Sequence, residues 1–231
     1  MSIRSFVLCV SLVLLFLGCR SQIESTTIEN TPAETIVSST PPFQTREPER
    51  YRATRTITIT TATGETIVTK TLIAKDGERR RQESDGTVYL ELPEGRFVLV
   101  PDEKIYADVA AEPDLNTEEQ VSPESLLHAD PGTTSYHTLE NEVIGGRKTN
   151  KYRVVVNNSN TQNVRLSETL IWIDEALKMP VRSEMTSTDG TRIQMELSDL
   201  SLAVERNFFQ IPEDYEKIAF SELRRRRMKS E

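Results

Sequence analysis

Histidine and cysteine, the residue types that most often carry catalysis and metal binding, are scarce in this chain. It has two histidines, His128 and His137, and two cysteines, Cys9 and Cys19. A hydrolytic triad would need a serine, a histidine and an acidic residue in contact, and the sequence has no Gly-x-Ser-x-Gly elbow to present the serine. No histidine or cysteine spacing matches a zinc site. We therefore predict that the protein is not an enzyme and carries no cofactor or metal.

Acidic residues exceed basic ones and fit a solvated surface better than an ion site. The formal net charge is −8 at neutral pH, and an acidic protein lacks the basic surface that nucleic-acid phosphates require. The densest acidic stretch, residues 112–119, does not have the Asp-x-Asp-x-Asp-Gly spacing of a calcium loop. We predict neither a nucleic-acid partner nor a calcium site.

The N-terminus has the features of an export signal. Arg4 precedes a run of 12 apolar or small residues, Phe6 to Leu17, which as a helix would reach about 18 Å and so fall short of the roughly 30 Å membrane core. Gly18 and Cys19 follow, and a small residue before a cysteine at the end of such a run resembles the bacterial lipoprotein signal. The alternative is an ordinary secretory signal with an accidental cysteine.

Under the lipoprotein interpretation, residues 1–18 are removed and Cys19 becomes an acylated N-terminus, with palmitate among its chains. No cysteine then remains in the rest of the protein to form a disulfide or a catalytic thiol. Three acyl chains would anchor the protein firmly, since each buried CH₂ contributes about 0.8 kcal/mol. Residues 19–49, rich in Ser, Thr, Pro and Glu, lack hydrophobic periodicity and are expected to form a disordered tether.

The remainder reads as an antiparallel β domain, residues 50–216. Short runs alternate apolar and polar residues and are separated by turn sequences every six to twelve residues. Asp85-Gly86 and Gly145-Gly146 are strong hairpin signals, because glycine accepts the positive φ of a tight turn. The fold class is mainly β, with about eleven expected strands: 54–60, 66–75, 78–83, 87–92, 96–100, 104–108, 135–144, 147–156, 163–174, 179–185 and 192–197.

Two segments depart from the strand pattern. Residues 109–134 contain Ser122-Pro123, where serine can cap a helix and proline suits its first turn. Leu126 and Leu127 follow, which predicts a short helical insertion with an apolar tip. Residues 217–231 form a basic C-terminal tail around Arg224–Arg227. This tail either docks on anionic lipid headgroups or is a solubilising, frayed terminus.

Four motifs, in this order, give the chain a family resemblance. They are Gly145-Gly146-Arg147 with Lys151-Tyr152-Arg153-Val154 soon after, Trp172-Ile173-Asp174, Leu177-Lys178-Met179-Pro180-Val181-Arg182, and Phe209-Gln210-Ile211-Pro212-Glu213-Asp214-Tyr215. Together with the meander and its helical insertion, they resemble the outer-membrane lipoprotein carrier superfamily, which includes LolA, LolB and the RseB amino-terminal domain. The resemblance implies a single, strongly curved antiparallel sheet (an open half barrel) with a short helical lid.

The resemblance also implies a concave apolar face that holds a lipid or acyl chain. The candidate ligand-lining residues follow from the alternation within the strands and from the lid tip: Ile57, Ile59, Val88, Leu90, Val98, Val100, Leu126, Leu127, Leu170 and Trp172. We therefore predict a non-enzymatic envelope lipoprotein, held in the outer membrane through Cys19 and facing the periplasm, that binds an acyl-chain ligand. The alternative is an RseB-like module with a filled cavity that senses stress or binds an envelope protein.

Overall fold

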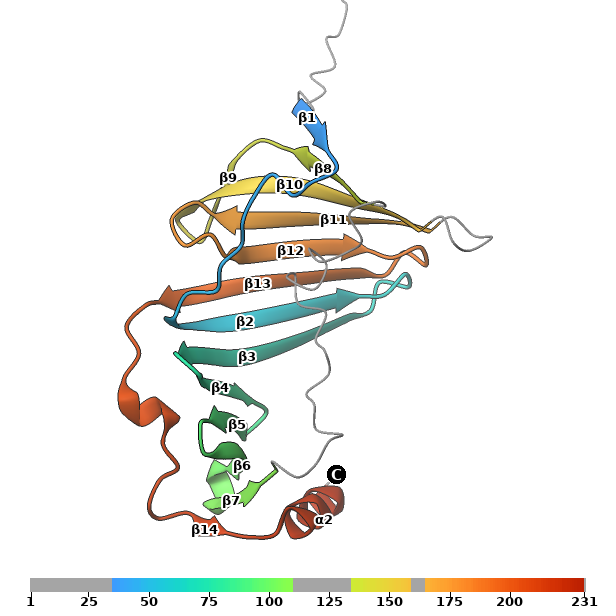
Figure 1. Ribbon diagram of the computed structural model, residues 1–231. Helices are drawn as coiled ribbons and strands as arrows, with labels where there is room; N and C mark the ends of the chain where they lie inside the picture. The colour runs from blue at the N-terminus through green and yellow to red at the C-terminus, as the bar shows by residue number, and fades with distance from the viewer. Residues whose placement is uncertain (1–34, 110–133, 159–164, 231) are drawn as a thin grey trace, which may run out of the picture. The chain divides into compact units, whose positions relative to one another are not determined.

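A computed structural model describes residues 35–109, 134–158 and 165–230 (Figure 1). All of these residues belong to one unit, Pro32–Glu231. The predicted lid tip, Leu126 and Leu127, and the proposed lipidation site, Cys19, lie outside the described residues. No helix among the residues that the structure describes is both long and apolar enough to cross a membrane.

The described strands form one open, mainly antiparallel sheet of fourteen strands, in the order β1-β8-β10-β11-β12-β13-β2-β3-β4-β5-β6-β7-β14, with β9 paired to β10. The strands are β1 (Thr35–Ser38), β2 (Arg50–Thr60), β3 (Thr66–Asp76), β4 (Arg79–Ser84), β5 (Thr87–Leu92), β6 (Gly95–Val100), β7 (Ile105–Asp108), β8 (Thr134–Thr138), β9 (Glu142–Ile144), β10 (Arg147–Asn158), β11 (Arg165–Asp174), β12 (Pro180–Thr186), β13 (Arg192–Ser201) and β14 (Glu216–Lys217). Short 3₁₀ turns, η1 (Pro101–Glu103) and η3 (Arg206–Phe209), and the helix α2 (Phe220–Ser230) complete the described elements.

The predicted fold class is confirmed, and each of the eleven expected runs forms a strand. The run 135–144 divides into β8 and β9, and β1 and β14 were not expected. Asp85 and Gly86 both have positive φ, 49° and 68°, and join β4 to β5 in the two-residue turn that the sequence predicts. β1 and β14 lie at opposite ends of the strand order, so the sheet is not closed into a barrel.

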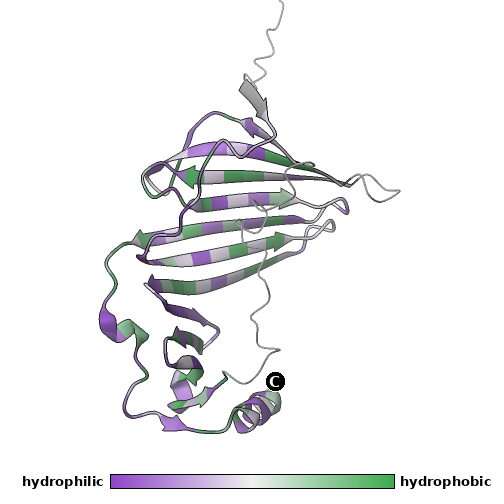
Figure 2. Ribbon diagram, viewed as in Figure 1, coloured by the Kyte–Doolittle hydropathy of each residue, from purple (hydrophilic) through white to green (hydrophobic). Residues whose placement is uncertain are grey.

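The register assigns every strand residue to one of two faces. Directly opposite residues share a face, and successive residues alternate. Figure 2 shows the resulting alternation of hydrophobic and hydrophilic bands along the strands. We call front face the one that carries Tyr51, Arg55 and Ile57 on β2, together with their partners on β3 and β13. The opposite face is the back face.

Different chain segments cover the two faces. On the front face, Phe43 packs on Tyr136 and Tyr152 at one end, and Leu223 of α2 packs near Val98 at the other. On the back face, a buried cluster from β3, β5 and β6 packs on the segment that follows β13: Ala74, Val88, Leu90, Leu92, Phe97, Leu99 and Phe209. Both faces of the sheet are therefore partly covered by short segments, and neither face by a continuous second layer of helices or strands among the described residues.

Two segments that the sequence placed outside the β domain make contacts with the sheet. Residues 35–49 were expected to be disordered, yet β1 pairs with β8, and the segment after it crosses the front face to β2 (Figure 1). Composition missed this because Phe43 and Glu47 find partners only across the folded sheet. Residues 217–231 are not a separate tail either: β14 pairs with β7, and α2 buries Leu223, which is 5% exposed. The apolar side of this short basic helix packs against the sheet through Leu223.

A candidate ligand-binding cleft on the front face

The predicted ligand-lining residues do not share one surface. Ile57, Ile59, Val98 and Val100 lie on the front face, whereas Val88, Leu90, Leu170 and Trp172 lie on the back face. These eight residues therefore cannot line a single cavity. The sequence could not show this, because a shift of one residue in register moves a whole strand's side chains to the other face.

Trp172 on the back face is covered by charged side chains. Its indole Nε1 donates to Glu142 Oε2 at 2.9 Å, while Lys151 Nζ and the Arg182 guanidinium lie 4.8 and 4.9 Å from the ring centroid. Only 2% of the residue is exposed. Cation–π contacts of this kind stabilise a ring against its neighbours. Trp172 also belongs to a buried hydrophobic cluster with Ile144, Met179 and Val181, so it is held by apolar neighbours as well as by charged ones.

The turn after Trp172 is built around Asp174, which belongs to the motif that carries the family resemblance. One carboxylate oxygen accepts the backbone N–H groups of Ala176 and Leu177 at 2.9 and 2.7 Å, and the other accepts Arg147 Nε. Burial alone would raise the pKa of Asp174, but these hydrogen bonds outweigh it and hold that pKa below its ordinary value. The same turn sets Met179 beside the front-face cleft.

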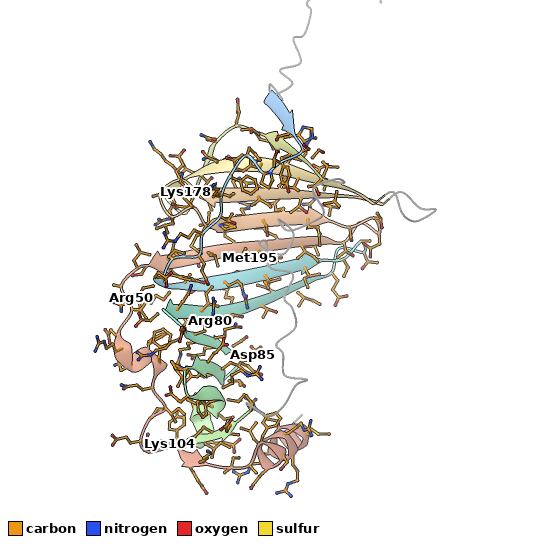
Figure 3. All side chains as sticks on the ribbon, viewed as in Figure 1. Arg50, Arg80, Asp85, Lys104, Lys178 and Met195 are labelled. Carbon is orange, nitrogen blue, oxygen red and sulfur yellow. The ribbon has the colours of Figure 1, made fainter. Side chains whose placement is uncertain are left out.

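The front face contains a cleft of about 320 Å³ near its middle. That volume is at the small end of ligand sites. The cleft lies between the N-terminal segment, the first half of β2, the end of β3, β4, the start of β12 and β13. Figure 3 labels two of its lining residues, Met195 and Arg80. Its lining residues are Glu47, Tyr51, Arg55, Ile73, Ala74, Arg80, Arg81, Gln82, Met179, Pro180, Met195 and Leu197. By the register, Ala74 and Arg81 border the cleft from strand positions that belong to the back face.

Glu47 fixes the N-terminal segment to one wall of the cleft. Its carboxylate accepts hydrogen bonds from the Tyr51 hydroxyl at 2.9 Å, from Lys75 Nζ at 2.9 Å, and from both terminal nitrogens of Arg80 at 2.9 and 2.6 Å. Burial alone would raise the pKa of Glu47, but the hydrogen bonds from Arg80 and Lys75 lower it overall. Glu47 is therefore ionised at neutral pH and neutralises part of the positive charge around it.

Arg55 lies in the cleft without a comparable partner. On the front face it stands directly opposite Leu197 and Thr71, and its Nε is buried and makes no hydrogen bond in the described structure. Burial lowers the pKa of Arg55, whereas the nearby phenol of Tyr51 acts in the opposite direction. An arginine starts from so high a pKa that it stays protonated at neutral pH. The cleft thus contains a half-buried positive charge.

An apolar strip continues from the cleft along the same face. Ile57 stands opposite Met195, and Ile59 stands opposite Ile193 on β13 and Ile67 on β3. Ile57, Ile59 and Ile193 are half-buried, and Ile67 is 51% exposed. Sequence alternation identified Ile57 and Ile59. Alternation did not identify Glu47, Met179 and Met195 as cleft residues. These three come together only through long-range strand pairing and the turn at Asp174.

The other sequence candidates are not brought into the cleft. Val98 and Val100 pack with Leu223 of α2, and Val88 and Leu90 pack with Phe209 on the back face. His137 lies on β8, in register with Arg153 on the back face; His128 lies outside the described residues. Within the described ranges, no group of three or more His, Cys, Asp or Glu residues could hold a metal ion.

Comparison with known proteins gives matches among solved structures. No known protein-family model and no curated protein sequence matches the chain. The chain is similar to a LolA superfamily protein from Nitrosomonas europaea, at 13% identity and a TM-score of 0.32, over 71% of this chain and 92% of that one. It is also similar to a chain of the Pseudomonas aeruginosa MucA/MucB complex, at 14% identity and a TM-score of 0.39. This match covers 73% of this chain and 58% of that one.

LprF from Mycobacterium bovis is similar at 14% identity and a TM-score of 0.33, over 72% of this chain and 90% of that one. Of these three structures, the one from Nitrosomonas europaea is described as a LolA superfamily protein. The similarity is one of fold at low identity.

Proposed function

We propose that this protein is a non-enzymatic, lipid-anchored protein of the bacterial cell envelope that binds an acyl-chain ligand on the front face of its sheet. One observation carries the proposal: the front-face cleft opens onto a strip of incompletely buried apolar side chains on β2, β3 and β13. Apolar surface that a fold leaves accessible in a concave site is the usual feature of a small-molecule pocket.

The chemistry of the cleft supports binding of an acyl chain. Ile73, Met179, Met195 and Leu197 supply aliphatic and thioether surface, and methionine adapts its shape to flexible apolar ligands. Removing an alkyl chain from water gains about 0.8 kcal/mol for each buried CH₂. The described lining residues include no serine, cysteine, threonine or histidine that could act as a nucleophile, so we assign binding without catalysis.

The envelope location and the anchor rest on the N-terminal sequence. The apolar run Phe6–Leu17 followed by Gly18-Cys19 supports export, cleavage and acylation of Cys19, palmitate included. A lipid anchor would hold the front-face cleft near a membrane, where acyl-chain ligands are abundant. Outer-membrane attachment on the periplasmic side, with Leu126 and Leu127 as lid residues, is part of this proposal.

A binding experiment on the full chain tests the function. The protein is purified in non-ionic detergent, examined by native mass spectrometry for co-purified lipid, and titrated with a fluorescent fatty acid. Met195→Gln places an amide in the apolar wall and should weaken fatty-acid binding about tenfold, which corresponds to about 1.4 kcal/mol. Gln194→Met, on the back face of the same strand, is the matched control and should bind as the wild type does.

The absence of both co-purified lipid and fatty-acid binding in the wild type would refute the proposal. Equal weakening by Met195→Gln and Gln194→Met would place the binding surface somewhere other than the front-face cleft.

A further inference from the structure

The residues that line the cleft carry more positive than negative charge, and Arg55 is the cation concerned. Among the cleft's lining residues there are three arginines and one glutamate, a local excess of two positive charges in a chain whose net charge is −8. Arg80 is neutralised by the two hydrogen bonds to Glu47. Arg81 bonds to Glu83 at 2.7 Å and to the carbonyl oxygen of Phe208 at 3.2 Å. Among the cleft's arginines, Arg55 has no anionic partner within the described ranges.

The immediate surroundings of Arg55 are apolar or neutral. Leu197 and Thr71 stand directly opposite it on the two neighbouring strands, and Met195 and Ile73 are diagonal to it on the same face. The ionisable neighbour is Tyr51, whose pKa is raised first by burial and further by the negative charge of Glu47, so its phenol is neutral at neutral pH. Arg55 is half-buried, and its buried Nε has no hydrogen-bond partner in the described part of the chain. Taking a cation partly out of water without a counter-charge is unfavourable, and a bound anion would offset that cost.

We infer that Arg55 receives the anionic head of the acyl-chain ligand, a carboxylate or a phosphate monoester, while the chain lies on the apolar strip of β2 and β13. This inference rests on the proposed function. A guanidinium presents a planar fork of N–H donors that matches the two oxygens of a carboxylate or phosphate. An anionic amphiphile would thus satisfy the charge and the apolar surface of the front face at once.

The geometry allows the two contacts to be made by one molecule. From Arg55 the front-face positions on β2 continue with Ile57 and Ile59, and Ile59 lies four residues on, about 14 Å along the strand. Ile193 and Met195 on β13 stand beside these two isoleucines. The inferred ligand therefore has its head in the cleft and its chain directed toward the β2–β3 hairpin.

The test compares ligands that differ only in the charge of the head. The full chain in non-ionic detergent is offered equimolar palmitate and methyl palmitate, and bound ligand is quantified by native mass spectrometry. The wild type should favour palmitate at least tenfold. Arg55→Met should reduce that preference to less than twofold while leaving methyl palmitate binding within twofold of wild type. Arg52→Met, on the back face of the same strand, should keep the full preference.

Additional measurements separate the remaining outcomes. Arg55→Lys should retain part of the preference, and circular dichroism should show each variant folded. Hexadecyl phosphate should compete with palmitate, whereas millimolar inorganic phosphate or acetate should not; displacement by inorganic phosphate alone would overturn the assignment of a lipid head. Persistence of the palmitate preference in Arg55→Met overturns the inference and leaves the proposed function standing. Failure of the wild type to bind either ligand overturns both.

Discussion

Replacing Glu47 with glutamine should detach the N-terminal segment from the front face. The wild-type carboxylate accepts four hydrogen bonds from Tyr51, Lys75 and Arg80, and only 23% of the Glu47 side chain is exposed. Glutamine keeps one acceptor oxygen and loses the charge. The variant leaves Lys75, whose side chain is 13% exposed, without an anionic partner.

The expected loss of stability is about 2 kcal/mol. A hydrogen bond to a charged group contributes about 1.5–3 kcal/mol, and breaking a fully buried ion pair costs about 3–5 kcal/mol. The Arg80 side chain is 45% exposed, so solvent weakens its interaction with Glu47. The expected loss of stability therefore lies nearer the value for a charged hydrogen bond than the value for a fully buried ion pair. Glu49→Gln is the matched control in the same segment. Its ion pair with Arg46 spans 4.0 Å with both side chains more than 70% exposed, and its loss should cost less than about 0.5 kcal/mol.

The effect of Glu47→Gln should depend on pH in one direction. The pKa of Glu47 is lower in the folded protein than its ordinary value of 4.5. Its stabilisation is therefore complete above about pH 4.5 and is lost as the pH falls through the lower, folded-state pKa. The difference in unfolding free energy between wild type and variant should be constant from pH 6 to 8 and shrink below pH 4.5.

Urea unfolding of the full chain, followed by the fluorescence of the single tryptophan, measures these differences. Limited proteolysis should cut the segment between β1 and β2 faster in Glu47→Gln than in Glu49→Gln. A loss below 0.5 kcal/mol at pH 7, or a loss unchanged at pH 3.5, would refute the assignment of Glu47 as the group that fixes this segment.

Two further predictions concern the turn and the anchor. Asp174→Asn should cost about 2–3 kcal/mol in urea unfolding, because Arg147 loses a carboxylate that is 2% exposed, while Glu175→Gln should stay within about 0.5 kcal/mol; equal effects would contradict the role given to Asp174. Cys19→Ser should abolish incorporation of labelled palmitate and release the protein from the membrane fraction, since acyl chains supply the anchoring free energy. Retention in membranes without acylation would show that something other than Cys19 holds the chain there.

The sequence by itself located most of the strands and the turns between them. Alternation of apolar and polar residues located all eleven expected runs, and Asp85-Gly86 fixed a tight hairpin, because these features depend on the steric preferences of neighbouring residues. The predicted export signal and the proposed acylation site depend on local sequence in the same way, because both are inferred from the consecutive residues 4–19.

Only the tertiary structure decided which side chains meet. The pairing of β2 with β13 joins residues about 140 positions apart and sets Arg55 beside Leu197 and Ile57 beside Met195. The pairings of β4 with β5 and of β11 with β12 place Val88 and Trp172 on the back face. The N-terminal segment brings Glu47 to Lys75 and Arg80. A strand's period of two is compatible with either face, so alternation alone cannot choose between them. Long-range pairing made that choice, and it thereby formed the front-face cleft and placed within it Arg55, which has no anionic partner in the part of the chain that the structure describes.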